Sequence, residues 1–170
     1  NLLFKKHSIK VAQILLSYDD FSDRGTYLNL RESLKRMFQL GIIPIINEND
    51  PISIDEIGPS FGDNDYLSSL VASKVDADLL VILTNVSGLY TKNPSRKDAM
   101  LISEVHDVDS KLEAMAGEKS SLGTGGIQTK IKAAKTAINA GVYVVIANGS
   151  IKDVLAKITK NENIGTIFYP

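Results

Sequence analysis

Three polar segments of the chain combine residue types that suit the binding and transfer of a charged group. Residues 47–50 (Asn-Glu-Asn-Asp) and residues 62–65 (Gly-Asp-Asn-Asp) are acidic and rich in amides, a mixture that suits an amino acid as ligand. Residues 123–130 are rich in glycine, so their backbone N–H groups can approach an anion that Lys130 can reach. Holding a charged small molecule beside a phosphate favours phosphoryl transfer, a reaction that depends chiefly on positioning and charge stabilisation.

Each segment also has a purely structural explanation. Asn and Asp favour turns, and Pro51 follows the first loop. Asp63 or Asn64 can cap a helix whose positive end attracts acids. The glycine segment can be an ordinary loop, and it matches neither the P-loop nor the GxGxxG pattern. Thr84 and Asn85 follow an apolar run and can bond the polar edges of a nucleoside, although alone they indicate only a turn.

Length, charge and residue composition limit the domain size, the partners and the compartment that we expect. The chain has 170 residues with 44% apolar content, enough for the core of one domain over residues 1–170. Its 19 basic and 20 acidic residues give a net charge of −1, so we expect neither a nucleic-acid nor a membrane partner. The absence of Cys suits the cytoplasm. His7 and His106 do not have metal-ligand spacing, so we expect no protein-held metal.

Strand-like and helix-like runs alternate along the chain and position these polar segments. We expect strands at residues 10–17, 42–46, 79–83, 101–105, 142–147 and 166–168, and helices at residues 27–40, 110–115, 126–139 and 154–158, with another from residue 63 or 64. The apolar strand 42–46 reads as buried on both faces. This order predicts an α/β fold: a three-layer α/β/α domain with a mainly parallel central sheet, in which ligands bind at the carboxyl ends of the strands.

The same stretches resemble the glutamate 5-kinases of the amino acid kinase family over nearly the whole chain. The resemblance depends on Pro-Ile-Ile-Asn-Glu-Asn-Asp at residues 44–50, Gly-Asp-Asn-Asp at 62–65, Leu-Thr-Asn at 83–85 with Gly-Leu-Tyr-Thr at 88–91, and Leu-Gly-Thr-Gly-Gly at 122–126 with Thr129 and Lys130. It implies transfer of the γ-phosphate of ATP to the side-chain carboxylate of glutamate, the first step of proline biosynthesis. Mg²⁺ would bridge the phosphate oxygens.

The resemblance also implies roles for individual residues. Asn47, Asp50 and Asn64 would bind glutamate, and Asp65 would hold the catalytic lysines in place. The nucleotide would be bound by Thr84, Asn85, Thr124, Gly125, Gly126, Ile127, Gln128, Thr129 and Lys130. Among these, Lys130 would offset the charge that develops on the transferred group.

The chain departs from the family pattern at two positions and lacks one segment. Asn85 stands where Asp is usual, and Ile127 stands where Met is common. The family's first strand and its phosphate loop have no counterpart, so we expect Asn1 to lie inside a longer protein, with the N-terminal part of the domain missing and no PUA domain in this chain. The family suggests a homo-oligomer inhibited by proline. Two alternatives stay open: a related kinase for another acidic substrate, and an inactive amino-acid-sensing module.

Overall fold

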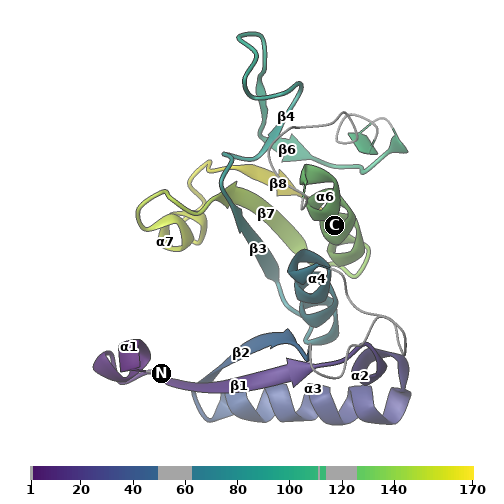
Figure 1. The fold of residues 1–170 in the computed structure, drawn as a ribbon, viewed down its shortest axis with the longest axis vertical. Coiled ribbons are helices and arrows are strands. Elements are labelled where there is room, and N and C mark those ends of the chain that lie inside the picture. Colours follow the sequence, from purple (N-terminus) through teal and green to yellow (C-terminus); the bar gives the residue numbers. More distant parts are fainter. Residues whose placement is uncertain (1, 50–62, 111, 114–125) are drawn as a thin grey trace. The chain divides into compact units, whose positions relative to one another are not determined.

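The computed structural model describes residues 2–49, 63–110, 112–113 and 126–170 (Figure 1). The chain divides into two compact units, Asn1–Leu67 and Ser68–Pro170. The boundary falls inside helix α4 (Asn64–Lys74). Each unit contains its own parallel strand pair, so each can be described by itself.

The first unit is built around a strand, helix, strand motif. Strands β1 (Lys10–Leu16) and β2 (Ile42–Glu48) pair in parallel, from Lys10 opposite Ile42 to Leu16 opposite Glu48. Helices α2 (Asp19–Ser22) and α3 (Arg24–Gln39) connect them, and α1 (Leu2–Lys6) precedes β1. A parallel pair needs such a crossover because a tight turn cannot reverse the chain twice.

Helix α3 has clear signals at both ends. The Asp23 carboxylate accepts hydrogen bonds from the Thr26 backbone N–H at 2.8 Å and from its hydroxyl at 2.9 Å. These bonds lower the pKa of Asp23 and cap the helix. At the other end Gly41 has φ +65°, as an αL C-cap requires. The predicted C-terminus near residue 40 is therefore confirmed, whereas the predicted start at residue 27 is late because Arg-Gly-Thr lacks apolar periodicity.

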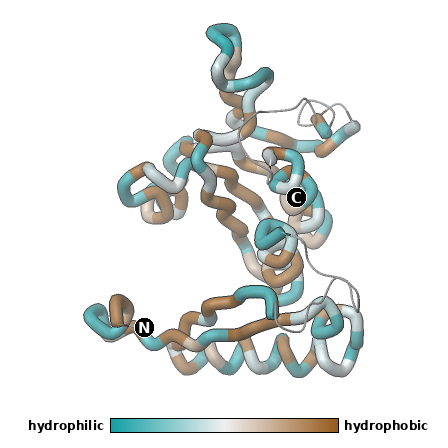
Figure 2. Tube along the Cα trace, viewed as in Figure 1, coloured by the Kyte–Doolittle hydropathy of each residue, from teal (hydrophilic) through white to brown (hydrophobic). Residues whose placement is uncertain are grey.

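The strand β2 is not buried on both faces within the described residues, so that prediction is wrong. Ile43 and Ile45 are each 45% exposed, whereas the alternate residues Ile42 and Ile46 are half-buried. Helix α3 packs against β2. Figure 2 shows that β2 is apolar over much of its length, so the apolar run correctly predicted the strand but not its surroundings.

The second unit contains a four-stranded sheet in the order β3-β7-β8-β6. Its strands are β3 (Leu79–Thr84), β6 (Glu104–Val105), β7 (Tyr143–Asn148) and β8 (Thr166–Phe168), and its helices include α6 (Ile127–Ile138) and α7 (Val154–Ile158). β3 and β7 are parallel, β7 and β8 antiparallel, and β8 and β6 parallel. Strands β4 (Leu89–Tyr90) and β5 (Leu101–Ile102) form a separate antiparallel pair.

The alternation of side chains along β3 and β7 makes this unit three layers thick. Ile82, Val144 and Ile146 point to one face and pack in one cluster with buried residues of α6. Val81 and Val145 point to the other face and pack in a second cluster with α7. Figure 1 shows α6 and α7 on opposite sides of β7. The predicted three-layer α/β/α arrangement is therefore present around this sheet.

Other predicted elements differ in outcome. The helix at residues 154–158 and the strand at 166–168 are confirmed at both ends. The single strand predicted at 101–105 is wrong: it divides at Ser103 into β5 and β6, which belong to different sheets. A helix starts at residue 110, where Asp109 Oδ1 accepts from Leu112 N–H at 2.7 Å, and residues 114–115 of that prediction lie outside the described residues. In the described part of the chain, no helix is long and apolar enough to cross a membrane.

Candidate functional site

Two parallel strands of the second unit end side by side at one edge of the sheet. Thr84, the last residue of β3, is opposite Asn148, the last residue of β7. The Gly149 N–H donates to the Thr84 carbonyl at 2.8 Å and ties the two strand ends together. Asn85, the next residue after β3, lies beside this edge, so the sheet places both predicted nucleotide contacts at a carboxyl end.

Helix α6 begins near the same edge. A tight turn joins α6 to β7, with Gly141 at φ +85°, and buried α6 residues pack on the face of the sheet that includes Val144. The 12-residue helix is about 18 Å long. Six extended residues of β7 span about 20 Å. A helix that returns antiparallel along β7 therefore places its first turn near the carboxyl end of that strand.

The first turn of α6 begins at a glycine. Its N-cap is Gly126, which has extended backbone and no side-chain capping hydrogen bond. A Cβ at this position would come no closer than 4.0 Å to the described atoms around it, so the glycine is not required by crowding. The Thr129 hydroxyl donates to the Gly126 carbonyl at 2.9 Å. N–H groups at such a helix start attract anions.

The three lysines of α6 have different surroundings. Lys135 pairs with Glu113 at 2.7 Å, and Lys132 is exposed. Lys130 is half-buried and lies one turn after Gly126. Of the three, Lys130 is therefore nearest to the predicted phosphate position.

The predicted glutamate contacts lie in the first unit. Asn47 is exposed and lies near the carboxyl end of β2, and Asn49 N–H donates to the Leu16 carbonyl at 2.9 Å. Asn64 is the first residue of α4, and Asp65 follows it in the first turn. The cap is Asp63, whose carboxylate accepts from the Asp65 N–H at 3.0 Å.

The structure thus places the site residues in two sets. Thr84, Asn85 and residues 126–130 belong to the second unit, the first two at the carboxyl end of β3 and the others at the start of α6. Asn47, Asn64 and Asp65 belong to the first unit. The remaining predicted residues, Asp50, Thr124 and Gly125, lie outside the described residues.

Two groups of polar residues at strand ends were missed from the sequence. After β7, Asn148 Oδ1 accepts from the Ser150 N–H at 2.8 Å, beside Thr84. After β1, the Asp20 carboxylate accepts from the Ser17 N–H at 2.6 Å and from its hydroxyl at 2.9 Å. Asn148 directly follows the predicted strand 142–147, and Ser17 ends the predicted strand 10–17; a polar residue at a strand end is the signal that could have found both groups.

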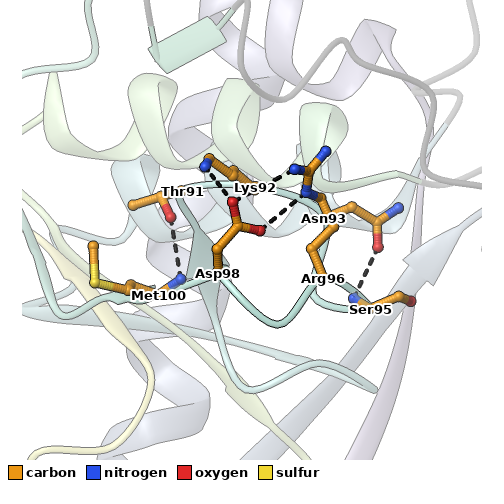
Figure 3. Close-up of polar contacts among 7 residues, drawn as sticks. All are labelled: Thr91, Lys92, Asn93, Ser95, Arg96, Asp98 and Met100. Carbon is orange, nitrogen blue, oxygen red and sulfur yellow. Dashed lines mark hydrogen bonds and ion pairs between the residues drawn. The ribbon is translucent and has the colours of Figure 1, made fainter.

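The loop of the β4–β5 hairpin carries a cluster of charged contacts that are internal to it (Figure 3). The Asp98 carboxylate bonds Arg96 Nε at 3.0 Å and Lys92 Nζ at 2.5 Å. These bonds, with Arg96 the stronger influence, lower the pKa of Asp98. Thr91 Oγ1 accepts from Met100 N–H at 3.1 Å and closes the loop. This cluster is solvent-exposed and reads as support for the hairpin.

Metal ligands from the protein do not gather within the described residues. No group of three or more His, Cys, Asp or Glu side chains in that part of the chain could hold a metal ion. His106 instead stacks on Tyr169, with ring centroids 4.5 Å apart. A Mg²⁺ ion that accompanies a nucleotide commonly takes most of its ligands from phosphate and water oxygens, so it does not require such a cluster.

Comparison with known proteins shows the protein family to which the chain belongs. The family model described as "Amino acid kinase family" matches residues 1–148. The chain belongs to the amino acid kinase family. Among solved structures, UMP kinase from Bacillus anthracis matches with a TM-score of 0.65 at 16% identity, over 99% of this chain and 61% of that one. An isopentenyl phosphate kinase from T. acidophilum matches with a TM-score of 0.62 at 19% identity, over 96% and 62%. These likenesses confirm the predicted fold.

Two curated relatives are similar in sequence to nearly the whole chain. The glutamate 5-kinase of Methanosarcina barkeri is 53% identical over 167 residues, covering 97% of this chain and 44% of that protein. The glutamate 5-kinase of Dehalococcoides mccartyi is 50% identical over 171 residues, covering 99% and 46%. The chain therefore spans less than half the length of these relatives.

Proposed function

We propose that the complete protein transfers the γ-phosphate of ATP to the side-chain carboxylate of glutamate and forms glutamyl 5-phosphate, as in the first step of proline biosynthesis. The observation that carries this proposal is the convergence of Thr84, Asn85 and the first turn of α6 on one sheet edge. The substrate comes from the similarity, at 53% identity over 97% of the chain, to a protein named glutamate 5-kinase.

The second unit would hold the nucleotide. The start of α6 and its glycine N-cap fit a phosphate group, because the N-terminus of a helix attracts anions and a glycine lets them approach the backbone closely. Thr84 and Asn85 would orient the nucleoside, and residues 124–129 would contact the phosphates. ATP supplies the phosphoryl group when bound, with Mg²⁺ shielding its oxygens. Lys130 would stabilise the negative charge that grows on the transferred group.

The first unit would hold glutamate. Asp50 would pair with the substrate ammonium, and the amides of Asn47 and Asn64 would bond its carboxylate oxygens. Asp65, in the first turn of α4, would orient the catalytic lysines. This arrangement needs no covalent enzyme intermediate, because the glutamate carboxylate is itself the nucleophile.

Further proposals follow from the family resemblance. They are a cytoplasmic location, a homo-oligomeric state, inhibition by proline, and a single kinase domain that includes residues 1–170. Proline titration of the complete protein tests the inhibition: the rate should fall as proline rises and recover with excess glutamate.

The proposed reaction is tested by a substrate panel. The complete protein with ATP and Mg²⁺ should yield a product that hydroxylamine traps as the hydroxamate when glutamate is present. Aspartate, N-acetylglutamate and UMP serve as competing acceptors. Equal or greater turnover with any of them would contradict the substrate assignment.

A further inference from the structure

A buried hydroxyl group joins the separate β4–β5 hairpin to the main sheet of the second unit. Thr166, the first residue of β8, has a relative exposure of 0%. Its Oγ1 accepts a hydrogen bond from the Leu89 N–H at 2.7 Å and donates one to the Ile102 carbonyl at 2.6 Å. Both capacities of the hydroxyl are therefore used, as burial requires.

The two partners of this hydroxyl face each other across the hairpin. Leu89 of β4 is opposite Ile102 of β5. A single side chain thus bonds both strands of the hairpin at the same register position, where β4 and β5 share no ladder with the four-stranded sheet. The Thr166 side chain takes the place of a missing backbone partner at this point.

Gly88 makes the approach possible. A Cβ at Gly88 would lie 2.6 Å from Thr166 Oγ1 and 3.0 Å from the Thr166 nitrogen, and the residue has φ +146°. Any side chain there would push the threonine away and strain the backbone. We call Thr166, Gly88 and the Leu89 N–H the clasp.

The clasp holds one end of the segment that carries Asn85. Residues 85–88 join β3 to β4. At the β3 end, the Thr84 carbonyl accepts from the Gly149 N–H at 2.8 Å. At the β4 end, the clasp anchors Leu89. The short turn between these two anchors has little freedom, so its position depends on both.

We propose that Thr166 is a positioning residue for nucleotide binding: through Leu89 and Gly88 it sets the position of the turn that carries Asn85. This inference rests on the proposed function for the role of Asn85 as a nucleotide contact. The expected effect on substrate binding is selective, because the proposed glutamate contacts lie in the other unit. Loss of the clasp should therefore weaken ATP and leave glutamate unaffected.

The test compares Thr166→Val with Thr166→Ser in the complete protein. Valine has nearly the same shape but removes both hydrogen bonds, whereas serine keeps the hydroxyl. Thr166→Val should raise the KM for ATP about tenfold and weaken MgATP in direct calorimetric binding by a similar factor. The KM for glutamate should stay within twofold, and Thr166→Ser should restore most of the ATP affinity.

A matched control is Thr159→Val, which removes an exposed hydroxyl that donates to the Ala156 carbonyl at 3.0 Å. It should leave both KM values unchanged. If Thr166→Val does not fold, Gly88→Ala disturbs the clasp from the other side, and it should likewise raise the KM for ATP selectively.

Four results distinguish the two proposals. A folded Thr166→Val protein with wild-type ATP affinity would contradict the positioning role of the clasp. Equal changes in the KM values for ATP and glutamate would contradict it as well. A wild-type protein that binds MgATP but does not phosphorylate glutamate would refute the proposed reaction, and a selective loss of MgATP binding in Thr166→Val would still support the clasp. A wild-type protein that does not bind MgATP would overturn both.

Discussion

The two units place similar apolar strands in different surroundings. In β7, Val144 and Ile146 are completely buried on the face that α6 covers, and Val145 packs against α7 on the other face. In β2, Ile43 and Ile45 are each 45% exposed, on a two-stranded sheet against which α3 packs. An apolar run therefore predicts a strand in both cases, but the depth of burial depends on how many layers cover it.

The same contrast separates the two sets of candidate site residues. The proposed nucleotide residues lie at the edge of a sheet with two covered faces, which can hold groups rigidly for chemistry. The proposed glutamate residues Asn47 and Asn64 are both exposed in a unit with a thinner sheet. We therefore expect the largest effect on stability in the second unit, and an effect mainly on glutamate affinity at Asn47 and Asn64 in the first.

The largest expected effect tests the difference in burial directly. Ile146→Ala should lower the free energy of unfolding by about 2 to 5 kcal/mol, because it leaves a cavity between covered layers. Ile45→Ala, the same substitution in β2, should cost only about 1 kcal/mol because that side chain already meets water. Urea unfolding of the complete protein measures both. Equal losses would show that another part of the protein covers Ile45 and would remove the contrast.

The next effect concerns catalysis by the second unit. Lys130→Ala should lower kcat by roughly 10² to 10³, because a charge-stabilising donor is lost in the transition state. Glutamate affinity in a binding assay should stay nearly intact. Lys132→Ala, an exposed lysine of the same helix, is the control and should leave kcat unchanged.

Asp65 links this prediction to the first unit. Asp65→Asn should give a similar defect in kcat, and the double variant with Lys130→Ala should be less than additive if the two residues act together. A Lys130→Ala protein with wild-type kcat and ATP dependence would show that the start of α6 does not bind the phosphates.

A smaller effect is expected for substrate affinity in the first unit. Asn47→Ala should raise the KM for glutamate about tenfold, because a ligand hydrogen bond is lost. The KM for ATP should hardly change. Asn29→Ala, an exposed asparagine on α3, is the matched control in the same unit. Unchanged glutamate kinetics in Asn47→Ala would indicate that residues 47–50 form a structural turn and do not bind the substrate.

The smallest effect is expected at the exposed hairpin loop. Bonds from Arg96 and Lys92 lower the pKa of Asp98 from its ordinary value, so their stabilising contribution is present at neutral pH and is lost as the pH falls through that lowered pKa. Because the side chains are half exposed, Asp98→Asn should leave the thermal midpoint at pH 7 nearly unchanged. An NMR titration of the Asp98 carboxyl should show a pKa below the ordinary value of an aspartate. An inflection at or above the ordinary value would show that the pair does not persist in solution.

Local sequence signals explain most of the elements that were predicted correctly. The helix at 154–158 and the strand at 166–168 agree at both ends, and Gly41 and Gly141 mark helix ends as expected. The errors occur where contacts between residues far apart in the chain determine the secondary structure. Residues 101–105 divide at Ser103 because its carbonyl accepts from the Ile167 N–H, a bond to a strand far along the chain.

The candidate site was likewise predictable in part. Thr84 and Asn85 were predicted from their place after an apolar run, and Lys130 from the glycine-rich segment before it; these roles stay predictions, while the structure places Thr84 at the carboxyl end of β3 and Lys130 near the start of α6. The neighbouring group at Asn148 was missed, because only the pairing of β3 with β7 places it opposite Thr84. Thr166 carried no signal in the sequence, since a single threonine at the start of a short strand is common and its two partners are far from it along the chain.

The sequence alone therefore determined the alternation of strands and helices, the helix caps and the family resemblance, because propensity, capping and periodicity act over a few neighbouring residues. Only the tertiary structure decided which strands pair, that β8 runs antiparallel to β7, and which apolar face is covered. It also decided that one buried hydroxyl ties the hairpin to the sheet. These features depend on contacts between residues far apart in the chain, and only the folded packing brings such residues together.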